Sequence, residues 1–366
     1  MSPRKTEDSS WTKNFTKTAQ GCLIATDILN YSNRKATAMK IALLLDPATR
    51  NMVFNEKCLK RLEKSGEVVI NENGTDFDSV APIIKDADVV VTSWGNKPID
   101  EEYLALCPNL KLLIHAAGSV KPVVSDALWK KGVRVTASAN VLSMGVSETA
   151  LGFTIAASKN FFAHNENIHN GGWAEGKENI RELYDLTIGV VGGGWAGRHY
   201  IELMQSFDVD IVLYDPFISE ERACELGVRK ADFETLLKES DIVSIHAPQI
   251  PETYHMFNAE TLKLMKKDAV LINTARGTII DENALYNHML EGNLKYACLD
   301  VTDPEPPAAD NPLRSIKNCI MTPHLAGLAN NGLKKIGQHV CEELELFISD
   351  GKLETEVTEE MLARMA

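Results

Sequence analysis

The chain has 366 residues, with 38 Lys and Arg against 51 Asp and Glu and a formal net charge of -13. That excess of acid opposes general binding to nucleic acid or to an anionic membrane surface, both of which attract cationic proteins. Hydrophobic residues make up 44% of the chain, and no uninterrupted apolar run approaches the roughly 18 residues of a membrane span. We therefore expect a soluble protein of about two domains, at roughly 150 residues per domain.

The seven cysteines include no CxxC pair, and their number is odd. This pattern predicts free, buried thiols in a reducing, cytoplasmic compartment. Residues 1–38 are rich in Ser and Thr, and their apolar runs are too short for the core of a signal peptide. We expect this stretch to be a tail or a misassigned start, with a targeting segment as the alternative.

From Met39 onward, short runs of Val, Ile and Leu alternate with segments of helical period. Such alternation is typical of parallel strands joined by crossover helices, so the predicted fold class is α/β. The first group of predicted strands comprises residues 41–45, 68–70, 89–92, 110–115 and 133–136. A helix is predicted at 146–162, followed by a polar connector or arm at 164–177.

A second group of predicted strands comprises residues 187–192, 210–214, 242–247, 269–274, 296–301 and 320–322. Six strands with helices between them predict a doubly wound sheet. A final helix is predicted at 328–348, with Gly351 as its stop signal, and we expect it to pack on the first domain. The predicted organisation is a tail at 1–38, a flavodoxin-like domain at 39–140 plus 328–366, and a second domain at 141–327 inserted in it.

A glycine-rich turn follows the first strand of the second group. Gly192, Gly194 and Gly197 form a GxGxxG pattern between that strand and a helical segment. The three glycines permit a tight turn, close approach of a pyrophosphate, and close packing of helix on strand, respectively. Asp215 ends the next strand, where a carboxylate can bind a ribose diol and repel a 2'-phosphate. The pattern predicts a Rossmann-type NAD site, with a methyltransferase-type nucleotide site or a plain glycine-rich turn as alternatives.

Three functional side chains follow three successive strands of the same group. Arg276 comes after the fourth strand, Glu305 after the fifth and His324 after the sixth. Carboxyl ends of parallel strands meet at one edge, so all three face the cofactor crevice. Each one alone has an ordinary structural explanation. Together they supply an anion clamp, an orienting acid and a proton donor.

These stretches resemble the NAD-dependent D-isomer-specific 2-hydroxyacid dehydrogenases, which include phosphoglycerate dehydrogenases, glyoxylate/hydroxypyruvate reductases and D-lactate dehydrogenases. The resemblance runs from about residue 40 to residue 351. Its motifs are residues 204–207 with 214–216, 246–248 with Thr253, 273–277, 299–301 with 305–306, and 323–324. It implies hydride transfer between NAD(H) and C2 of a small D-2-hydroxy or 2-keto acid of the hydroxypyruvate, glyoxylate or phosphoglycerate type. It also implies a homodimer with an arm near 162–181.

The resemblance implies that Arg276 holds the substrate carboxylate, that His324 is the acid/base, and that Glu305 holds and polarises His324. No metal is implied. The positions expected to bind the cofactor are Gly192, Gly194, Trp195, Ala196, Gly197, Asp215, Ala247, Pro248, Thr274, Ala275 and Asp300. The positions expected to bind the substrate, besides Arg276, are Ala117, Gly118 and Ser119.

Two positions depart from the family pattern. Trp195 stands where the pyrophosphate loop usually carries Arg, and Lys121 stands where the substrate loop commonly ends in an acidic residue. A site between two domains also implies hinge closure, expected near 140–146 and 325–328. The family includes corepressors that retain the same Arg, Glu and His, so an NAD(H)-sensing regulatory protein is the alternative function.

Overall fold

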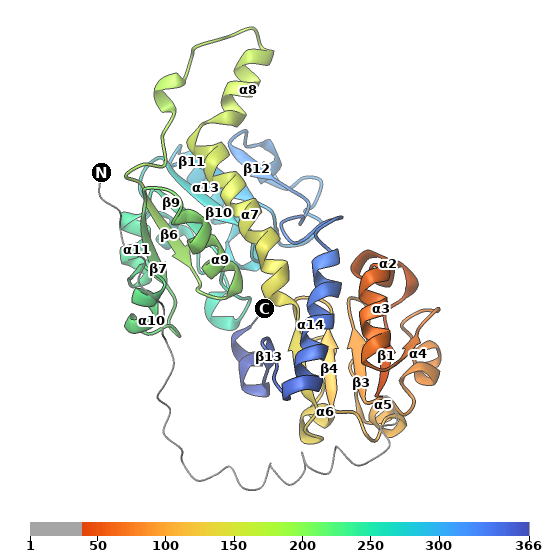
Figure 1. Cartoon of the computed structure of the whole chain (residues 1–366). Coiled ribbons are helices and arrows are strands. Elements are labelled where there is room, and N and C mark those ends of the chain that lie inside the picture. The colour runs from red at the N-terminus through yellow and green to blue at the C-terminus, as the bar shows by residue number, and fades with distance from the viewer. Residues whose placement is uncertain (1–38, 366) are drawn as a thin grey trace, which may run out of the picture. The chain divides into compact units, whose positions relative to one another are not determined.

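The computed structural model describes residues 39–365, which form two sheets (Figure 1). The predicted tail, with Cys22, lies outside the described residues. The first sheet has the strand order β13-β5-β4-β3-β1-β2, and the second has the order β12-β11-β10-β9-β6-β7-β8. All strand pairs except β13 with β5 are parallel. The predicted α/β class with two parallel sheets is therefore confirmed.

Five parallel strands of the first sheet have the flavodoxin-like order. The six strands are β1 (Lys40–Leu43), β2 (Glu67–Ile70), β3 (Val89–Thr92), β4 (Leu112–His115), β5 (Arg134–Ala137) and β13 (Glu356–Val357). Strands β3 and β4 are wholly buried, as expected for apolar runs in the middle of a parallel sheet. The flanking helices are α2 (Pro47–Val53), α3 (Glu56–Ser65), α4 (Phe77–Ile84), α5 (Glu101–Leu106) and α6 (Asp126–Lys130).

The second sheet has seven strands where the sequence predicted six. They are β6 (Thr187–Val191), β7 (Asp210–Tyr214), β8 (Arg229–Lys230), β9 (Ile242–Ile245), β10 (Ala269–Asn273), β11 (Leu294–Leu299) and β12 (Cys319–Met321). The unpredicted strand, β8, consists of two basic residues at a sheet edge, so no apolar run in the sequence indicates it. The flanking helices are α9 (Trp195–Met204), α10 (Glu220–Glu225), α11 (Phe233–Glu239), α12 (Ala259–Leu262) and α13 (Glu282–Leu290).

The helix predicted at 146–162 is wrong at both ends. Helix α7 spans Ala139–Ser158, and a second helix, α8 (Phe161–His169), occupies the start of the predicted connector. The break falls at Asn160, whose φ of 57° is left-handed, a conformation that Asn adopts more readily than most residues. Among the described residues, α7 alone is long and apolar enough to cross a membrane. Half of that stretch is buried, and it packs on α9 and β10 as a helix of the protein core.

The last long helix, α14 (Lys334–Asp350), begins later than predicted. Its end is confirmed, because Gly351 caps it with a φ of 65° and donates its N–H to the carbonyl of Phe347. Helix α14 packs against α3, where Arg61 forms an ion pair with Glu345 at 2.7 Å. Strand β13 then joins the first sheet in antiparallel register with β5. This two-residue strand was not predicted, because it is too short to give a periodic pattern.

Candidate active site

The glycine-rich turn joins β6 to α9. Gly192 has a φ of 98°, and a Cβ there would lie 2.8 Å from the backbone N of Ala247. A Cβ on Gly197 would collide with the carbonyl of Gly192, so these two glycines allow strand, turn and helix to pack together. Gly194 differs, because a Cβ there would meet nothing within 4 Å. It is the N-cap of α9 and makes no side-chain cap, which leaves open space at the first amides of the helix, a position where helix amides can bind a phosphate.

Asp215 follows β7 and lies against the same turn. Its Oδ2 accepts a hydrogen bond from the N–H of Gly193, and its Oδ1 accepts one from the N–H of Phe217, both at 2.8 Å. The carboxylate forms no ion pair with any residue in 39–365. Each oxygen has a second lone pair for a ribose hydroxyl. The geometry therefore fits a diol at this position.

Trp195 is half-exposed at the start of α9, and Arg198 stacks on it. The guanidinium carbon of Arg198 lies 4.5 Å from the centroid of the Trp195 ring, a cation–π contact. Burial lowers the pKa of Arg198, as does the charge of Arg222, while Asp215 opposes the shift. The guanidinium that the sequence lacks at position 195 is therefore present one helical turn further along.

The turn after β10 carries a polar atom without a partner. Thr274 Oγ1 is buried and makes no hydrogen bond in the structure. Asn273 fixes this turn, because its Oδ1 accepts from the N–H of Ala275 and its Nδ2 donates to the carbonyl of Arg276. A buried hydroxyl without a partner at the carboxyl end of a strand is what a bound cofactor would satisfy.

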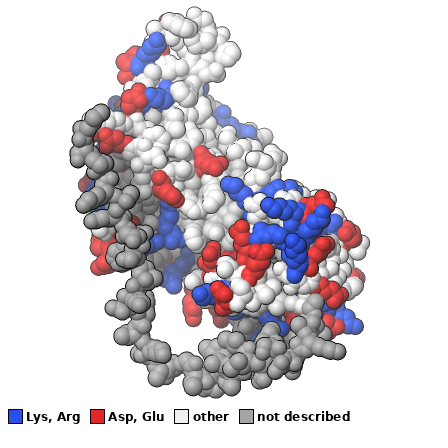
Figure 2. Space-filling view, viewed as in Figure 1, with Lys and Arg blue, Asp and Glu red and all other residues white. Residues whose placement is uncertain are grey.

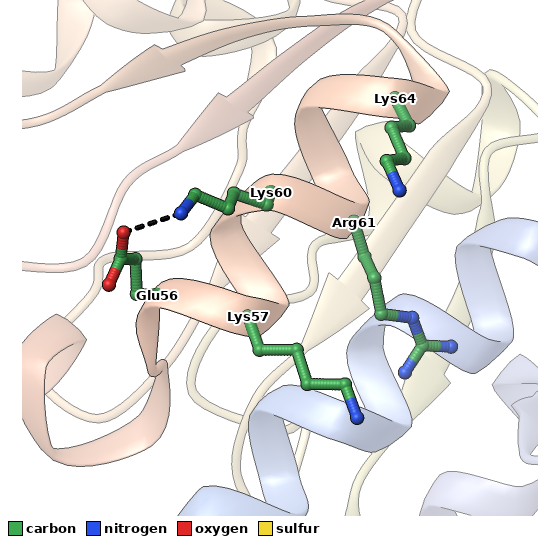
Figure 3. Close-up of a pocket in the computed structure, with 5 residues that line it drawn as sticks. All are labelled: Glu56, Lys57, Lys60, Arg61 and Lys64. Carbon is green, nitrogen blue, oxygen red and sulfur yellow. Dashed lines mark hydrogen bonds and ion pairs between the residues drawn. The ribbon is translucent and has the colours of Figure 1, made fainter.

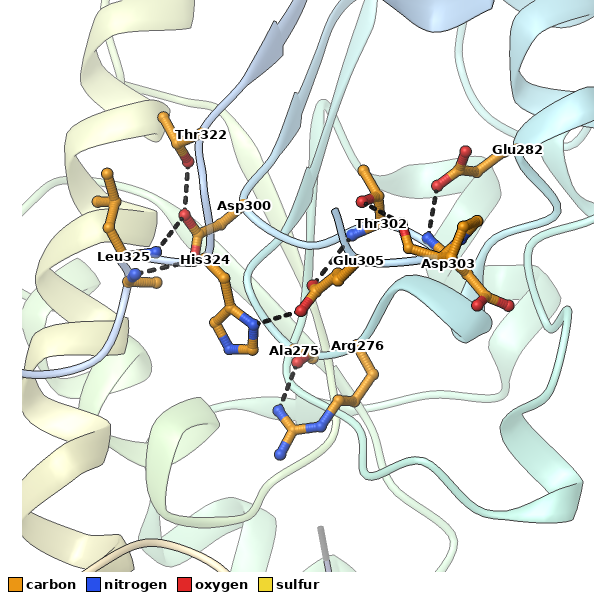
Figure 4. Close-up of polar contacts among 12 residues, drawn as sticks. Ala275, Arg276, Glu282, Asp300, Thr302, Asp303, Glu305, Thr322, His324 and Leu325 are labelled. Carbon is orange, nitrogen blue, oxygen red and sulfur yellow. Dashed lines mark hydrogen bonds and ion pairs between the residues drawn. The ribbon is translucent and has the colours of Figure 1, made fainter. Parts of the chain in front are cut away.

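The Glu305 and His324 side chains meet as the sequence predicts (Figure 4). His324 Nδ1 lies 2.7 Å from Glu305 Oε2, and Glu305 Oε1 accepts the N–H of Thr302 at 3.2 Å. The two side chains are 51% and 38% exposed, which keeps them accessible to a substrate. Because Nδ1 faces the carboxylate, Nε2 is the nitrogen left to exchange a proton with a substrate.

Asp300 holds the turn that presents His324. It is only 1% exposed, and its carboxylate accepts from Thr322 Oγ1 at 2.5 Å, the Leu325 N–H at 2.9 Å and the Ala326 N–H at 2.8 Å. These bonds stabilise His324 in a left-handed conformation with a φ of 49°. Sequence reasoning placed Asp300 beside the cofactor and missed this positioning role. Its only sequence signal is that Asp300 directly follows a buried strand.

Arg276 follows β10 and is largely buried. Its Nη1 donates to the carbonyl of Ala275 at 2.7 Å, and it forms no ion pair with another described residue. Burial lowers the pKa of this guanidinium, and the nearby charge of Glu305 opposes that shift. Its remaining donors are therefore available to an anionic ligand, which a desolvated guanidinium binds strongly.

The predicted substrate loop follows β4 in the first sheet. The carbonyl of Ala117 accepts the N–H of Ser138 at 3.0 Å, and a Cβ on Gly118 would lie 3.3 Å from Leu142 Cδ1. Lys121 ends the loop, and its Nζ donates to the carbonyl of Met365 at 2.6 Å. The loop therefore rests on α7 and on the last described residues. Contact of 117–119 with a substrate stays a prediction.

The two predicted hinge segments touch each other. A Cβ on Gly145 of α7 would lie 2.8 Å from the carbonyl carbon of Gly327, and Thr149 Oγ1 donates to the carbonyl of Ala326 at 3.3 Å. Only a glycine allows this approach of helix and chain. The N–H groups of Leu325 and Ala326 in this segment donate to Asp300, so the crossing is continuous with the His324 turn.

A basic hollow of about 350 Å³ lies on α3 (Figures 2 and 3), lined by Glu56, Lys57, Lys60, Arg61 and Lys64. Lys60 pairs with Glu56 and Arg61 with Glu345, so half of its cations already have acidic partners. It includes none of the motif residues. Across residues 39–365 there is also no group of three or more His, Cys, Asp and Glu arranged to hold a metal ion.

Residues 151–326 match the sequence profile of the D-isomer specific 2-hydroxyacid dehydrogenase NAD binding domain. The chain is 34% identical over 293 residues to a D-3-phosphoglycerate dehydrogenase of Methanocaldococcus jannaschii, covering 80% of this chain and 55% of that protein. It is 32% identical over 268 residues to a glyoxylate reductase of Korarchaeum cryptofilum, covering 72% of this chain and 80% of that protein.

A solved phosphoglycerate oxidoreductase from Rhizobium etli has the same fold. The TM-score is 0.77 at 23% identity, over 88% of this chain and 99% of that one. The chain spans about half the length of the phosphoglycerate dehydrogenases that it matches.

Proposed function

Because this chain belongs to the D-isomer-specific 2-hydroxyacid dehydrogenase family, we propose that it transfers a hydride between NAD(H) and C2 of a small D-2-hydroxy acid or the matching 2-keto acid. The observation that carries the proposal is the 2.7 Å pairing of His324 with Glu305. The substrates that we propose are of the hydroxypyruvate, glyoxylate or phosphoglycerate type. Membership of this family also removes the methyltransferase alternative.

NAD(H) supplies or accepts the hydride when bound, and the residues of the second sheet fit it. The open space at Gly194 and the first amides of α9 would take the pyrophosphate, beside Trp195 and Ala196. Asp215 would take the adenosine ribose. The Thr274 hydroxyl would give its unused hydrogen bond to the nicotinamide half, near Asp300. Further positions proposed to contact the cofactor are Ala247, Pro248 and Ala275.

His324 would move the proton. In reduction the developing alkoxide gains a proton from the imidazolium, and in oxidation the neutral imidazole accepts it. Glu305, which lies 2.7 Å from Nδ1, would hold the ring so that Nε2 faces the substrate. Asp300 keeps the His324 turn in place without touching the reacting atoms.

Arg276 would hold the substrate carboxylate. A planar guanidinium binds a carboxylate at two points, which fixes the face of the carbonyl that meets the hydride. Its burial removes competing water and strengthens the ion pair. Residues 117–119 would contact the remainder of the substrate and so distinguish one keto acid from another.

The test is steady-state turnover of glyoxylate, hydroxypyruvate, pyruvate, phosphohydroxypyruvate and bulky 2-keto acids with NADH. We expect at least one to be reduced with a kcat/KM above about 10⁴ M⁻¹s⁻¹, and the His324→Gln protein to lose that activity. Tight NADH binding without turnover of any keto acid would instead support the NAD(H)-sensing alternative.

We further propose a homodimer in a reducing, cytoplasmic compartment. Exposed apolar side chains gather in and around α8, among them Phe161, Ile168 and Trp173, the last 75% exposed. Such a patch is typical of a protein interface. All six described cysteines are free, although Cys224 is exposed where buried thiols were expected. Sedimentation analysis of the wild type and of Trp173→Ser tests the dimer, which the substitution is expected to weaken.

A further inference from the structure

The segment after β13 crosses from one sheet to the other. Residues 358–365, which we call the strap, form a short 3-10 helix over Glu359–Arg364. Leu362 and Met365 pack against the buried cluster of the first sheet. Strand β13 precedes the strap and pairs with β5, so the strap is anchored at its start (Figure 1).

The last residue of the strap, Met365, contacts the predicted substrate loop. Lys121 Nζ donates to the carbonyl of Met365 at 2.6 Å. Lys121 is the residue that departs from the family pattern at the end of that loop. Its ammonium therefore has a partner within the chain and is held by the strap.

The neighbouring residue of the strap, Arg364, contacts the turn after β7 in the second sheet. The guanidinium carbon of Arg364 lies 5.3 Å from the centroid of the Phe217 ring, which is within the range of a cation–π contact. The N–H of Phe217 donates to Asp215 Oδ1 at 2.8 Å. Arg364 therefore stacks on the residue whose amide orients the carboxylate assigned to the ribose.

We propose that the strap couples the two binding loops, with Arg364 as a positioning residue for Asp215 and Lys121 as the anchor on the substrate side. The proposal rests on the proposed function only for the identity of the two ligands. When the strap is docked, Phe217 and Asp215 are held in the ribose-binding arrangement. By thermodynamic linkage, a cofactor that prefers this arrangement must in turn favour the docked strap.

The first experiment measures NADH affinity by fluorescence titration, without turnover. Phe217 is 59% exposed, and an exposed cation–π contact supports an effect of about two- to fivefold. We expect Arg364→Ala to raise the NADH dissociation constant by that factor, and Arg364→Lys to fall between it and the wild type. Glu359→Gln, an exposed change on the same strap, is the matched control and is expected to bind NADH as the wild type does.

The second experiment tests coupling between the loops. Lys121→Met is expected to weaken NADH binding by about twofold, although Lys121 lies in a loop of the other sheet, and to raise KM for the keto acid. The Lys121→Met/Arg364→Ala double variant is expected to lose less than the product of the two single losses, because either substitution undocks the strap. Full multiplicativity of the two losses contradicts the coupling.

Hydrogen exchange on the wild-type chain tests the proposal without any substitution, so a folding defect in a variant cannot affect the result. Saturating NADH is expected to slow amide exchange in residues 358–365. Unchanged exchange there, or an unchanged NADH dissociation constant in Arg364→Ala, contradicts the proposal that the strap couples the two loops. These readouts do not depend on turnover. Absence of keto-acid reduction would contradict the proposed function but not the proposal that the strap couples the two loops.

Discussion

Two loops at the carboxyl ends of buried strands are built in opposite ways. In the second sheet, the loop after β11 carries the carboxylates of Asp300 and Glu305, whose oxygens all accept hydrogen bonds, several of them from the turn after β12 that presents His324. In the first sheet, the loop after His115 is made of Ala, Gly, Ser and Val and ends at Lys121, which the strap holds. The loop of the second sheet is therefore fixed by many short polar bonds, whereas the loop of the first sheet lies on α7 and on the strap.

We infer from this difference that the two loops have different tasks. Proton transfer needs its acid within hydrogen-bonding distance and at a fixed angle, so the loop that carries it is rigid. Choice among keto acids depends on the size and polarity of a surface, which small residues can adjust without loss of the chemistry. Changes in the rigid loop should therefore lower kcat, and changes in the adjustable loop should alter which substrate is used.

The largest effect is expected at His324. Replacing it with Gln preserves a polar side chain but removes the proton donor, so the rate of reduction should fall by about 10² to 10⁴. NADH binding should persist, because the turn is fixed by Asp300 and not by the imidazole. Stopped-flow reduction and NADH titration measure the two quantities. Near wild-type turnover in His324→Gln would mean that His324 has only a structural role. The control is His169→Gln, at an exposed site on α8.

The next effect concerns the cofactor and stays within the second sheet. A 2'-phosphate beside Asp215 meets a like charge, and a penalty of about 2 to 4 kcal/mol corresponds to a preference for NADH of roughly 30- to 1000-fold in kcat/KM. Asp215→Ala should narrow this ratio. Asp210→Asn, at the exposed start of the same strand, should not. Equal kcat/KM with NADH and NADPH in the wild type would contradict the role of Asp215.

A smaller effect is expected at Arg276, which we assign to the substrate and not the cofactor. Arg276→Lys keeps the charge but loses the planar fork. The loss of one charge-assisted hydrogen bond should lower kcat/KM for keto acids by about 10- to 100-fold. The NADH dissociation constant should stay unchanged. Arg314→Lys is the matched control, because that guanidinium bonds to backbone carbonyls of its own loop. A large loss of NADH affinity in Arg276→Lys would mean that Arg276 binds the cofactor and not the substrate.

The sequence predicted the rigid loop better than the adjustable one. Strands with buried apolar runs were placed within a few residues. Each of Arg276, Glu305 and His324 alone has an ordinary structural explanation, and they stood out only because they follow three successive strands of one sheet. The bonds of Asp300 could not be predicted, since they join it to amides more than twenty residues away. Strands β8 and β13 were missed because two residues show no period. The contact of Arg364 with Phe217 depends on the packing of distant segments, which a local pattern does not record.

The smallest effect concerns the loss of folding stability on acidification, to which one buried histidine in each sheet contributes. Each has a buried histidine after or at the end of a strand: burial lowers the pKa of His115 to about 4 and that of His246 to about 3. In the unfolded chain a histidine has a pKa near 6.5, so the unfolded state binds more protons as pH falls below about 7. Stability conferred by each neutral imidazole is therefore present above that pH and is lost progressively on acidification toward the folded value.

The adjustable loop gives the sharper test, because His115 directly precedes it and shares a 2.9 Å hydrogen bond with Thr92 Oγ1. From pH 7 to pH 5 a histidine with these pKa values costs about 2 kcal/mol of unfolding free energy. His115→Gln keeps a hydrogen-bonding side chain but does not titrate, so its stability should fall by about 2 kcal/mol less than that of the wild type over this range. Urea unfolding at both pH values, with His169→Gln as the exposed control, measures the difference. Identical pH dependence in His115→Gln and the wild type would mean that folding does not lower the pKa of His115, and would contradict a neutral, buried imidazole beside the substrate loop.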